Sequence, residues 1–215
     1  VVCNTPDAPS ISTAEHTMSL LMAASKFTAN NVARLRAGRQ DFYAAHEGIE
    51  LSGATIGVVG HGRIGSRVAR MCAAMDMRVI VCDPYVEVVE HEQVDLDVIL
   101  TESRIITMHT PLTDETRNLL DAAAFARMQD GVIIVNAARG GVIDTQALVD
   151  ALDSGKVYAA GLDVIAPEPL DPEHTLLNRD NVVVTPHIAS ATDKGRVRMY
   201  SGAIENARQV LAGER

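Results

Sequence analysis

The chain has 215 residues, 47% hydrophobic and 22% charged, as in an ordinary globular protein, and no apolar run approaches the ~20 residues that cross a bilayer. Its formal net charge of −9 disfavours nucleic acid and anionic membrane surfaces as partners, because both attract a basic face. Three widely spaced cysteines, Cys3, Cys72 and Cys82, form neither a disulfide framework nor a zinc motif and are typical of reduced thiols in a cytoplasmic protein.

The first predicted element is a helix that begins near Thr13, where Ser12-Thr13-Ala14-Glu15 fits a capping box. Its apolar residues lie on most sides of the helix, so we expect another domain or a second subunit to cover it. A second helix is predicted for residues 29–37. Residues 39–53 have the glycines and polarity of a connecting segment.

From residue 54 onward, short apolar runs alternate with helical patterns. Strands are predicted at 54–59, 78–82, 104–108, 132–136, 157–164 and 181–185. Helices are predicted at 62–75, 93–101, 121–129, 144–154 and 191–212. This alternation is typical of βαβ units and predicts an α/β fold: a doubly wound parallel sheet of the Rossmann type, with helices on both faces. Such sheets bind ligands at the C-terminal ends of their strands.

A glycine motif, Gly60-His61-Gly62-Arg63-Ile64-Gly65, stands between the first of these strands and its helix. Gly60 permits a tight turn, and Gly62 lets a pyrophosphate approach the backbone at the helix N-terminus. Gly65 allows close packing of helix on strand. The acidic residue at the end of the second strand, Asp83, can accept hydrogen bonds from an adenosine ribose. Together these features predict a dinucleotide site.

The choice between NAD and NADP follows from Asp83. The additional phosphate of NADP would lie where Asp83 meets the ribose, and like charges ~4 Å apart repel by roughly 1 to 4 kcal/mol. No arginine or lysine directly follows Asp83 to compensate. We therefore expect a preference for NAD of at least about tenfold.

Polar side chains follow the later strands, and we expect the rim of the sheet to bring them together. Hydride addition to a carbonyl leaves charge on oxygen, and a histidine is suited to deliver the proton. A carboxylate on its far ring nitrogen fixes the ring, while an arginine binds a substrate carboxylate and polarises the carbonyl. Arg139, Glu168 and His187 fit these three catalytic roles. His109, followed by Thr110-Pro111, suggests a backbone contact with the cofactor instead.

Each of these side chains also has an ordinary interpretation. Arg139 could be a surface cation, Glu168 a solvated loop acid, and His187 a satisfied buried histidine. We expect His61, within the glycine motif, to be exposed. The other histidines, for which the sequence shows no convergent partners, are His16, His46, His91 and His174. No pair of residues has metal-ligand spacing, so no metal is expected.

Taken together, these segments resemble the D-isomer-specific 2-hydroxyacid dehydrogenase family, which includes phosphoglycerate dehydrogenase and glyoxylate/hydroxypyruvate reductase. The resemblance runs over nearly the whole chain, and many motifs occur in one order. They are Asn4-Thr5-Pro6, Thr13-Ala14-Glu15-His16, the glycine motif, Asp83-Pro84, His109 to Thr116, Asn136 to Gly141, Asp163-Val164, Glu168-Pro169-Leu170 and Thr185-Pro186-His187-Ile188.

The resemblance implies an NAD-dependent oxidoreductase that transfers a hydride between nicotinamide and a D-2-hydroxyacid or 2-oxoacid. Arg139 would bind the substrate, and His187, assisted by Glu168, would act as acid and base. Asp163 would meet the nicotinamide amide. The helix after Thr13 resembles the family's dimerisation element, which implies a homodimer. The implied cofactor contacts are Gly60, Gly62, Arg63, Ile64, Gly65, Asp83, Thr110, Pro111, Ala137, Ala138, Asp163, His187, Ala189 and Ser190.

The resemblance also implies a domain division. Residues 1–190 would form the NAD-binding Rossmann domain, including the dimerisation helix, and residues 191–215 a C-terminal helix that packs on a substrate lobe. Family members carry this lobe before the segment Asn4-Thr5-Pro6, almost at the start of the sequence here. Hydride transfer needs a clamped substrate and excluded water. These 215 residues alone are therefore expected to bind NAD with weak or absent turnover.

Two alternatives stay open at this stage. Formate dehydrogenase resembles the family but pairs its histidine with a glutamine, so Glu168 argues against it. A non-catalytic NAD-sensing dimer, such as a transcriptional corepressor, can keep the same three residues. Turnover discriminates between these classes, because an enzyme must oxidise NADH in the presence of substrate whereas a sensor only binds it.

Overall fold

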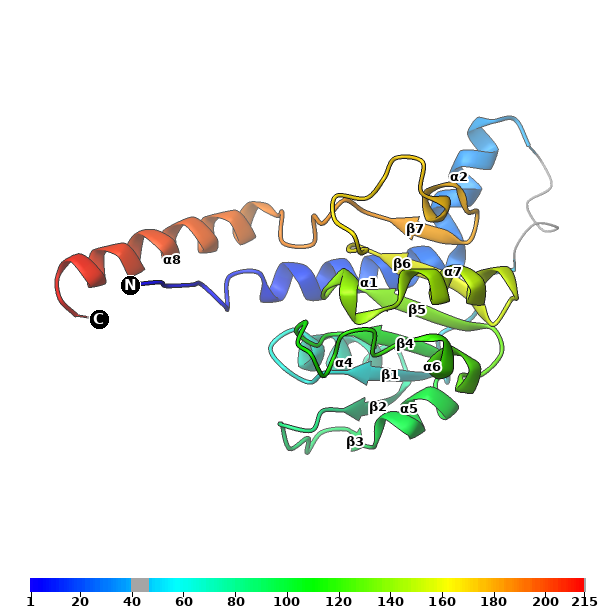
Figure 1. The fold of residues 1–215 in the computed structure, drawn as a ribbon, viewed down its shortest axis with the longest axis horizontal. Coiled ribbons are helices and arrows are strands. Elements are labelled where there is room, and N and C mark those ends of the chain that lie inside the picture. The colour runs from blue at the N-terminus through cyan, green and yellow to red at the C-terminus, as the bar shows by residue number, and fades with distance from the viewer. Residues whose placement is uncertain (40–46, 215) are drawn as a thin grey trace.

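The computed structural model describes residues 1–39 and 47–214, and within them the central feature is one parallel sheet (Figure 1). The strand order is β3-β2-β1-β4-β5-β6-β7, and every neighbouring pair is parallel. This confirms the predicted doubly wound α/β fold. The strands are β1 (Thr55–Val59), β2 (Arg78–Cys82), β3 (Glu92–Gln93), β4 (Ile105–Met108), β5 (Val132–Asn136), β6 (Val157–Leu162) and β7 (Val182–Val184).

The helices follow the predicted order. They are α1 (Ser10–Lys26), α2 (Thr28–Arg36), α4 (Gly65–Ala73), α5 (Leu96–Glu102), α6 (Ala122–Arg127), α7 (Thr145–Asp153) and α8 (Asp193–Leu211), with 3₁₀ turns η1 (Gly140–Val142) and η2 (Thr175–Asn178). Of the connection predicted at 39–53, residues 40–46 lie outside the described part of the chain. The strand predicted at 157–164 ends two residues early, at Leu162, because Asp163 already belongs to the loop at the sheet edge.

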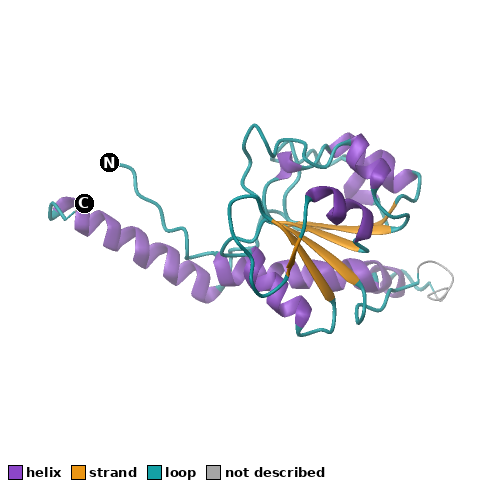
Figure 2. Ribbon diagram, turned by 90° about the horizontal axis from the view of Figure 1, so that it is seen from below, coloured by secondary structure: helices purple, strands orange, loops and turns teal. Residues whose placement is uncertain are grey.

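Helices cover both faces of the sheet, and each face has its own hydrophobic core (Figure 2). Helices α1 and α4 pack on one face, where the inward side chains of β1 are Ile56 and Val58. Helices α5, α6 and α7 contribute to the core of the other face. Because side chains alternate along a strand, a parallel strand buried on both faces must be apolar throughout. This explains runs such as residues 132–135, all fully buried.

Helix α1 begins at Ser10, three residues before the predicted start, and the predicted capping box is wrong. No side chain caps α1, and the hydroxyl of Ser12 lies 2.7 Å from Thr192 Oγ1 instead. Residues Leu20 and Leu21 are buried against the sheet, with α4 alongside. The chain's own sheet therefore covers much of this helix, which accounts for apolar residues that we had assigned to another domain or subunit.

Helix α8 extends away from the sheet, beside the N-terminal segment (Figures 1 and 2). Arg198 Nε donates to the carbonyl of Ala8 at 3.0 Å, and Asn206 Nδ2 donates to the carbonyl of Asn4 at 2.9 Å. Of the residues in α8, Gly195 is the one that is buried. Among the described residues, no helix combines the length and apolarity that a membrane span requires.

Candidate active site

A cavity of about 550 Å³ lies at the C-terminal ends of the strands, where a doubly wound sheet binds its ligand. It brings together most of the residues predicted from the sequence. Those on its wall are Gly62, Arg63, Ile64, Thr110, Pro111, Ala137, Ala138, Arg139, Asp163, His187, Ala189 and Ser190. The remaining four, Gly60, Gly65, Asp83 and Glu168, are not on the wall, although Glu168 contacts His187 directly.

A second hollow, of about 630 Å³, lies on the other side of the glycine turn. Its wall includes arginines of α4, among them Arg67 and Arg70, but none of the three predicted catalytic residues. The 550 Å³ cavity, which Arg139 and His187 line, is therefore the candidate active site. Among the residues described, no cluster of three or more histidine, cysteine or acidic side chains could hold a metal ion.

The glycine turn has the geometry that a pyrophosphate needs. Gly60 has φ +95°, and a Cβ on Gly65 would lie 1.9 Å from the carbonyl oxygen of Gly60, so both positions require glycine. Gly62 faces open space on the cavity wall, so the backbone there is accessible. No side chain caps α4, so none occupies the N-terminal end of this helix, where an anionic ligand would lie. These observations fit a dinucleotide.

Asp83 is fixed at the end of β2 by three backbone donors. Its Oδ2 accepts from the N–H of His61 at 2.7 Å, and its Oδ1 accepts from the N–H groups of Tyr85 and Val86 at 2.9 and 3.2 Å. The carboxylate is therefore held against the glycine turn, as a ribose contact requires. The prediction that His61 is exposed is wrong, because its ring is 9% exposed and packs edge-on against the ring of His91.

A contact that the sequence did not suggest joins the two loops beyond Asp83. Tyr85, after β2, donates its hydroxyl to Glu115 Oε2, after β4, at 2.6 Å. This hydrogen bond, with the charge of Glu115, raises the pKa of Tyr85 above its usual value. Both side chains are exposed, and their hydrogen bond joins the loops after β2 and β4, the two strands on either side of β1.

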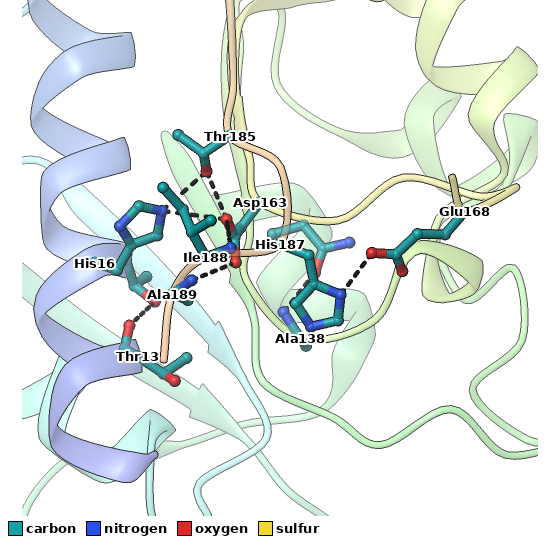
Figure 3. A network of polar contacts seen from close by, with 11 residues as sticks. Thr13, His16, Ala138, Asp163, Glu168, Thr185, His187, Ile188 and Ala189 are labelled. Atoms are coloured by element: carbon teal, nitrogen blue, oxygen red, sulfur yellow. Dashed lines mark hydrogen bonds and ion pairs between the residues drawn. The ribbon is translucent and has the colours of Figure 1, made fainter. Parts of the chain in front are cut away.

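At the opposite end of the cavity, the ring of His187 is oriented by Glu168 (Figure 3). His187 Nδ1 lies 2.5 Å from Glu168 Oε1, and the two side chains are 47% and 49% exposed. This contact leaves Nε2 for a reacting group. The backbone of His187 has φ +53°, a left-handed conformation that costs about 1 kcal/mol or more outside glycine. Its N–H is held by the carbonyls of Asp163 and Thr185, at 2.9 and 3.0 Å.

Arg139 lies on the same cavity wall, in a loop that a buried asparagine shapes. Asn136, 1% exposed, accepts from the N–H of Ala138 and donates to the carbonyl of Arg139, both at 3.0 Å. The guanidinium itself is exposed and donates to the carbonyl of Ala138 at 2.6 Å. The structure thus brings Arg139 and His187 to one cavity and places Glu168 behind the histidine.

His109 shares the wall but differs chemically from His187. Burial lowers the pKa of His109 to about 3, so its imidazole is neutral at physiological pH. Its Nε2 lies 3.0 Å from Thr107 Oγ1, and its N–H donates to the carbonyl of Val59 at 2.7 Å. His109 is therefore not an imidazolium near neutral pH and is poorly suited to act as a general acid there.

Asp163 is buried and anchors the turn that carries His187. Its Oδ1 accepts from the hydroxyl of Thr185 at 2.6 Å and from the N–H of Ile188 at 2.9 Å, and its Oδ2 accepts from the N–H of Ala189 at 2.9 Å. His16 Nε2 lies 2.9 Å from Thr185 Oγ1 and 3.3 Å from Asp163 Oδ1 (Figure 3). The interpretation that His16 has no convergent partners is therefore wrong.

Comparison with known proteins identifies the family to which this chain belongs. The family model "D-isomer specific 2-hydroxyacid dehydrogenase, NAD binding domain" matches residues 18–189. The chain belongs to this family. The match covers the whole sheet and every predicted site residue except Ser190, and it identifies NAD as the cofactor of this domain.

Individual members of the family are similar over nearly the whole chain. A D-3-phosphoglycerate dehydrogenase of Archaeoglobus fulgidus is 44% identical, over 93% of this chain and 38% of its own length. A hydroxypyruvate reductase of Thermotoga maritima is also 44% identical, over 95% of this chain and 68% of its own length. The crystal structure of the TT0316 protein of Thermus thermophilus has a TM-score of 0.93 at 40% identity, covering 98% of this chain and 68% of that one.

The chain thus spans about two fifths of the length of the Archaeoglobus fulgidus dehydrogenase and about two thirds of the length of the Thermotoga maritima reductase.

Proposed function

We propose that the protein is an NAD-dependent oxidoreductase that transfers a hydride between nicotinamide and a D-2-hydroxyacid or its 2-oxoacid. One observation carries this proposal. A histidine whose far nitrogen is 2.5 Å from a carboxylate shares a cavity wall with an arginine and with the glycine turn. Membership of the dehydrogenase family supports it.

The side chains divide the chemistry as follows. Bound NADH supplies the hydride that adds to the carbonyl carbon. Arg139 binds the substrate carboxylate through parallel N–H donors and stabilises the charge that develops on the carbonyl oxygen. His187 Nε2 gives its proton to that oxygen, so that the hydroxyl forms, and takes it back in the reverse direction. Glu168 keeps the His187 ring in the required orientation through Nδ1.

Cofactor binding involves both ends of the cavity. Gly62, Arg63 and Ile64 would hold the pyrophosphate on the cavity wall, while Gly60 and Gly65 permit the tight turn that carries them. Asp83 accepts from the adenosine ribose and disfavours the phosphate of NADP. The remaining contacts, nearer the nicotinamide, are Thr110, Pro111, Ala137, Ala138, Asp163, His187, Ala189 and Ser190. The open backbone at Gly62 and the triple anchoring of Asp83 support this assignment.

The wider organisation is also a proposal. Residues 1–190 form the NAD-binding unit, and residues 191–215 form a C-terminal segment whose helix α8 packs on a substrate lobe. The exposure of α8 supports this division. A homodimer forms through α1, whose outer face presents Ile11 and Met22, each 39% exposed. The free cysteines support a reducing, cytoplasmic location.

The test is a panel of 2-oxoacids with NADH, run on the full-length protein and on Arg139→Ala. The wild-type protein should oxidise NADH with at least one 2-oxoacid. Arg139→Ala should lower kcat/KM by about 10²–10³ or more, while the NADH Kd stays within about threefold. Tight NADH binding with no turnover on any 2-oxoacid would favour the NAD-sensing dimer instead. The Glu168–His187 contact disfavours formate as the substrate.

A further inference from the structure

The donors and acceptors around Asp163 determine which proton His16 holds. The hydroxyl of Thr185 has one hydrogen, and it donates this hydrogen to Asp163 Oδ1, because an ionised carboxylate only accepts. The oxygen of Thr185 must then accept the second contact, at 2.9 Å, from His16 Nε2. Asp163 Oδ1, 3.3 Å away, can only accept as well. His16 Nε2 therefore carries a proton that points at the Thr185–Asp163 pair.

The two oxygens of Asp163 have different surroundings. Oδ1 meets the Thr185 hydroxyl, the N–H of Ile188 and, more distantly, His16. For Oδ2 the contact shown is the N–H of Ala189. A carboxylate oxygen has about two acceptor positions. Oδ1 is thus filled from inside the protein, while Oδ2 keeps capacity for a donor from the cavity that Asp163 lines.

We propose that His16 is a positioning residue: from α1 it fixes the Thr185–Asp163 pair, and thereby the orientation of Asp163 Oδ2 and the turn that carries His187. This rests on the proposed function for the role of His187. The carboxylate of Asp163 is 1% exposed, and a buried charge is stable only when its donors surround it. Of the donors named around Asp163 and Thr185, His16 is the most distant in sequence, 169 positions from Thr185.

The geometry gives His16 a fixed platform. Helix α1 has 17 residues and is anchored on the sheet through buried side chains on either side of His16, including Ala14 and Leu20. The turn, by contrast, contains a left-handed residue, His187, which hydrogen bonds must hold in place. Loss of the His16 proton contact would leave the Thr185 oxygen without its donor and would free Asp163 to reorient.

The experiment compares two ligands that share the adenosine end of the cavity. ADP-ribose lacks the nicotinamide, so it does not reach Asp163, whereas NADH does. Both dissociation constants are measured by calorimetry on the full-length protein and on His16→Ala, His16→Gln and Ser19→Ala. Glutamine places an amide N–H donor at a reach similar to that of Nε2. Ser19 lies exposed on the same helix and serves as the control.

In His16→Ala we expect the NADH Kd to rise about tenfold, as loss of a hydrogen bond near a charged group predicts, and the ADP-ribose Kd to stay within about twofold. His16→Gln should recover NADH binding to within about threefold of wild type. Ser19→Ala should match wild type for both ligands. With an active 2-oxoacid, kcat of His16→Ala should also fall by about tenfold, because His187 loses its alignment.

Equal weakening of both ligands would overturn the proposal in favour of a purely structural role for His16. Unchanged NADH binding in His16→Ala, or a His16→Gln variant no better than His16→Ala, would also overturn it. These outcomes do not depend on turnover. A wild-type protein that reduces no 2-oxoacid would defeat the proposed function while the comparison of NADH with ADP-ribose still decides the role of His16.

Discussion

The two ends of the cavity are built in different ways. In the proposed complex, the backbone of the glycine turn and the carboxylate of Asp83 would hold the adenosine end of the cofactor. Both follow adjacent strands and lie within 24 consecutive residues, 60–83. The nicotinamide end is assembled from the loops after β5, β6 and β7, with His16 of α1 behind them. Its key side chains, Glu168 and His187, are about half exposed.

This contrast indicates how each end responds to change. A backbone site depends on conformation, so it is sensitive to the few positions where a side chain cannot fit. A side-chain site depends on each functional group and on the contacts that orient it, so single substitutions there should alter chemistry before they alter cofactor binding.

The largest effect should come from His187→Gln in the full-length protein. The variant loses the acid and base but keeps a hydrogen-bonding side chain, so kcat should fall by about 10²–10⁴ while the NADH Kd changes by less than about threefold. Steady-state kinetics and calorimetry measure the two quantities. A fall in kcat smaller than tenfold would mean that another group transfers the proton.

Substitutions in the glycine turn should act on binding instead. Gly65→Ala places a Cβ 1.9 Å from the Gly60 carbonyl oxygen, and overpacking of this kind costs about 1–3 kcal/mol, so both Tm and NAD affinity should fall, the latter by about tenfold or more. Gly62→Ala is the matched control, since no atom lies within 4 Å of its added Cβ. It should leave Tm unchanged and still weaken NAD. Equal Tm losses in both variants would contradict the assignment.

Asp83→Ala should change cofactor preference rather than stability of the catalytic end. Removing the carboxylate removes its repulsion of the NADP phosphate, and it also removes the contact with the NAD ribose. The ratio of the NADP Kd to the NAD Kd should therefore fall by about tenfold. Calorimetric titration with each cofactor gives this ratio. An unchanged ratio would exclude Asp83 as the ribose acceptor.

The smallest effect should come from Tyr85→Phe, which removes the hydroxyl contact with Glu115 across the two adenosine-side loops. Contacts between exposed side chains contribute little, so the NAD Kd should change by at most about fivefold. A larger change would show that this contact organises the adenosine end more strongly than its exposure suggests.

The glycine turn and the place of Asp83 at the end of β2 were predictable from the sequence because their determinants are local. The strand, the glycine spacing and Asp83 all lie within one βαβ unit, where conformation follows from neighbouring residues. The parallel pairing of the strands was predictable for a similar reason, since alternating strands and helices build parallel sheets. The two-residue strand β3 carries no apolar signal, Glu92 and Gln93 being polar, so its pairing became visible only in the structure.

At the nicotinamide end, the sequence suggested candidate residues but none of the contacts that support them. Arg139, Glu168 and His187 follow from chemistry and position, whereas the contact between His16 and Thr185 joins residues 169 positions apart. No local pattern encodes such a pair. The capping box failed for the same reason, because Ser12 bonds to Thr192 rather than to its own helix. Tertiary partners override local signals at both places.

The placement of α1 on β5, β6 and β7 has a consequence for how the molecule forms. A ribosome delivers this helix before the sheet, yet the strands that receive it are the last three of the sheet in chain order. The half of the sheet around β1 and β2 can assemble during synthesis from contacts close in the chain. The other half must wait until β7 has emerged. In a nascent chain, the glycine turn is thus expected to fold before the turn that carries His187. Closure of the long-range contacts between α1 and the last strands is expected to limit the rate of the final folding step.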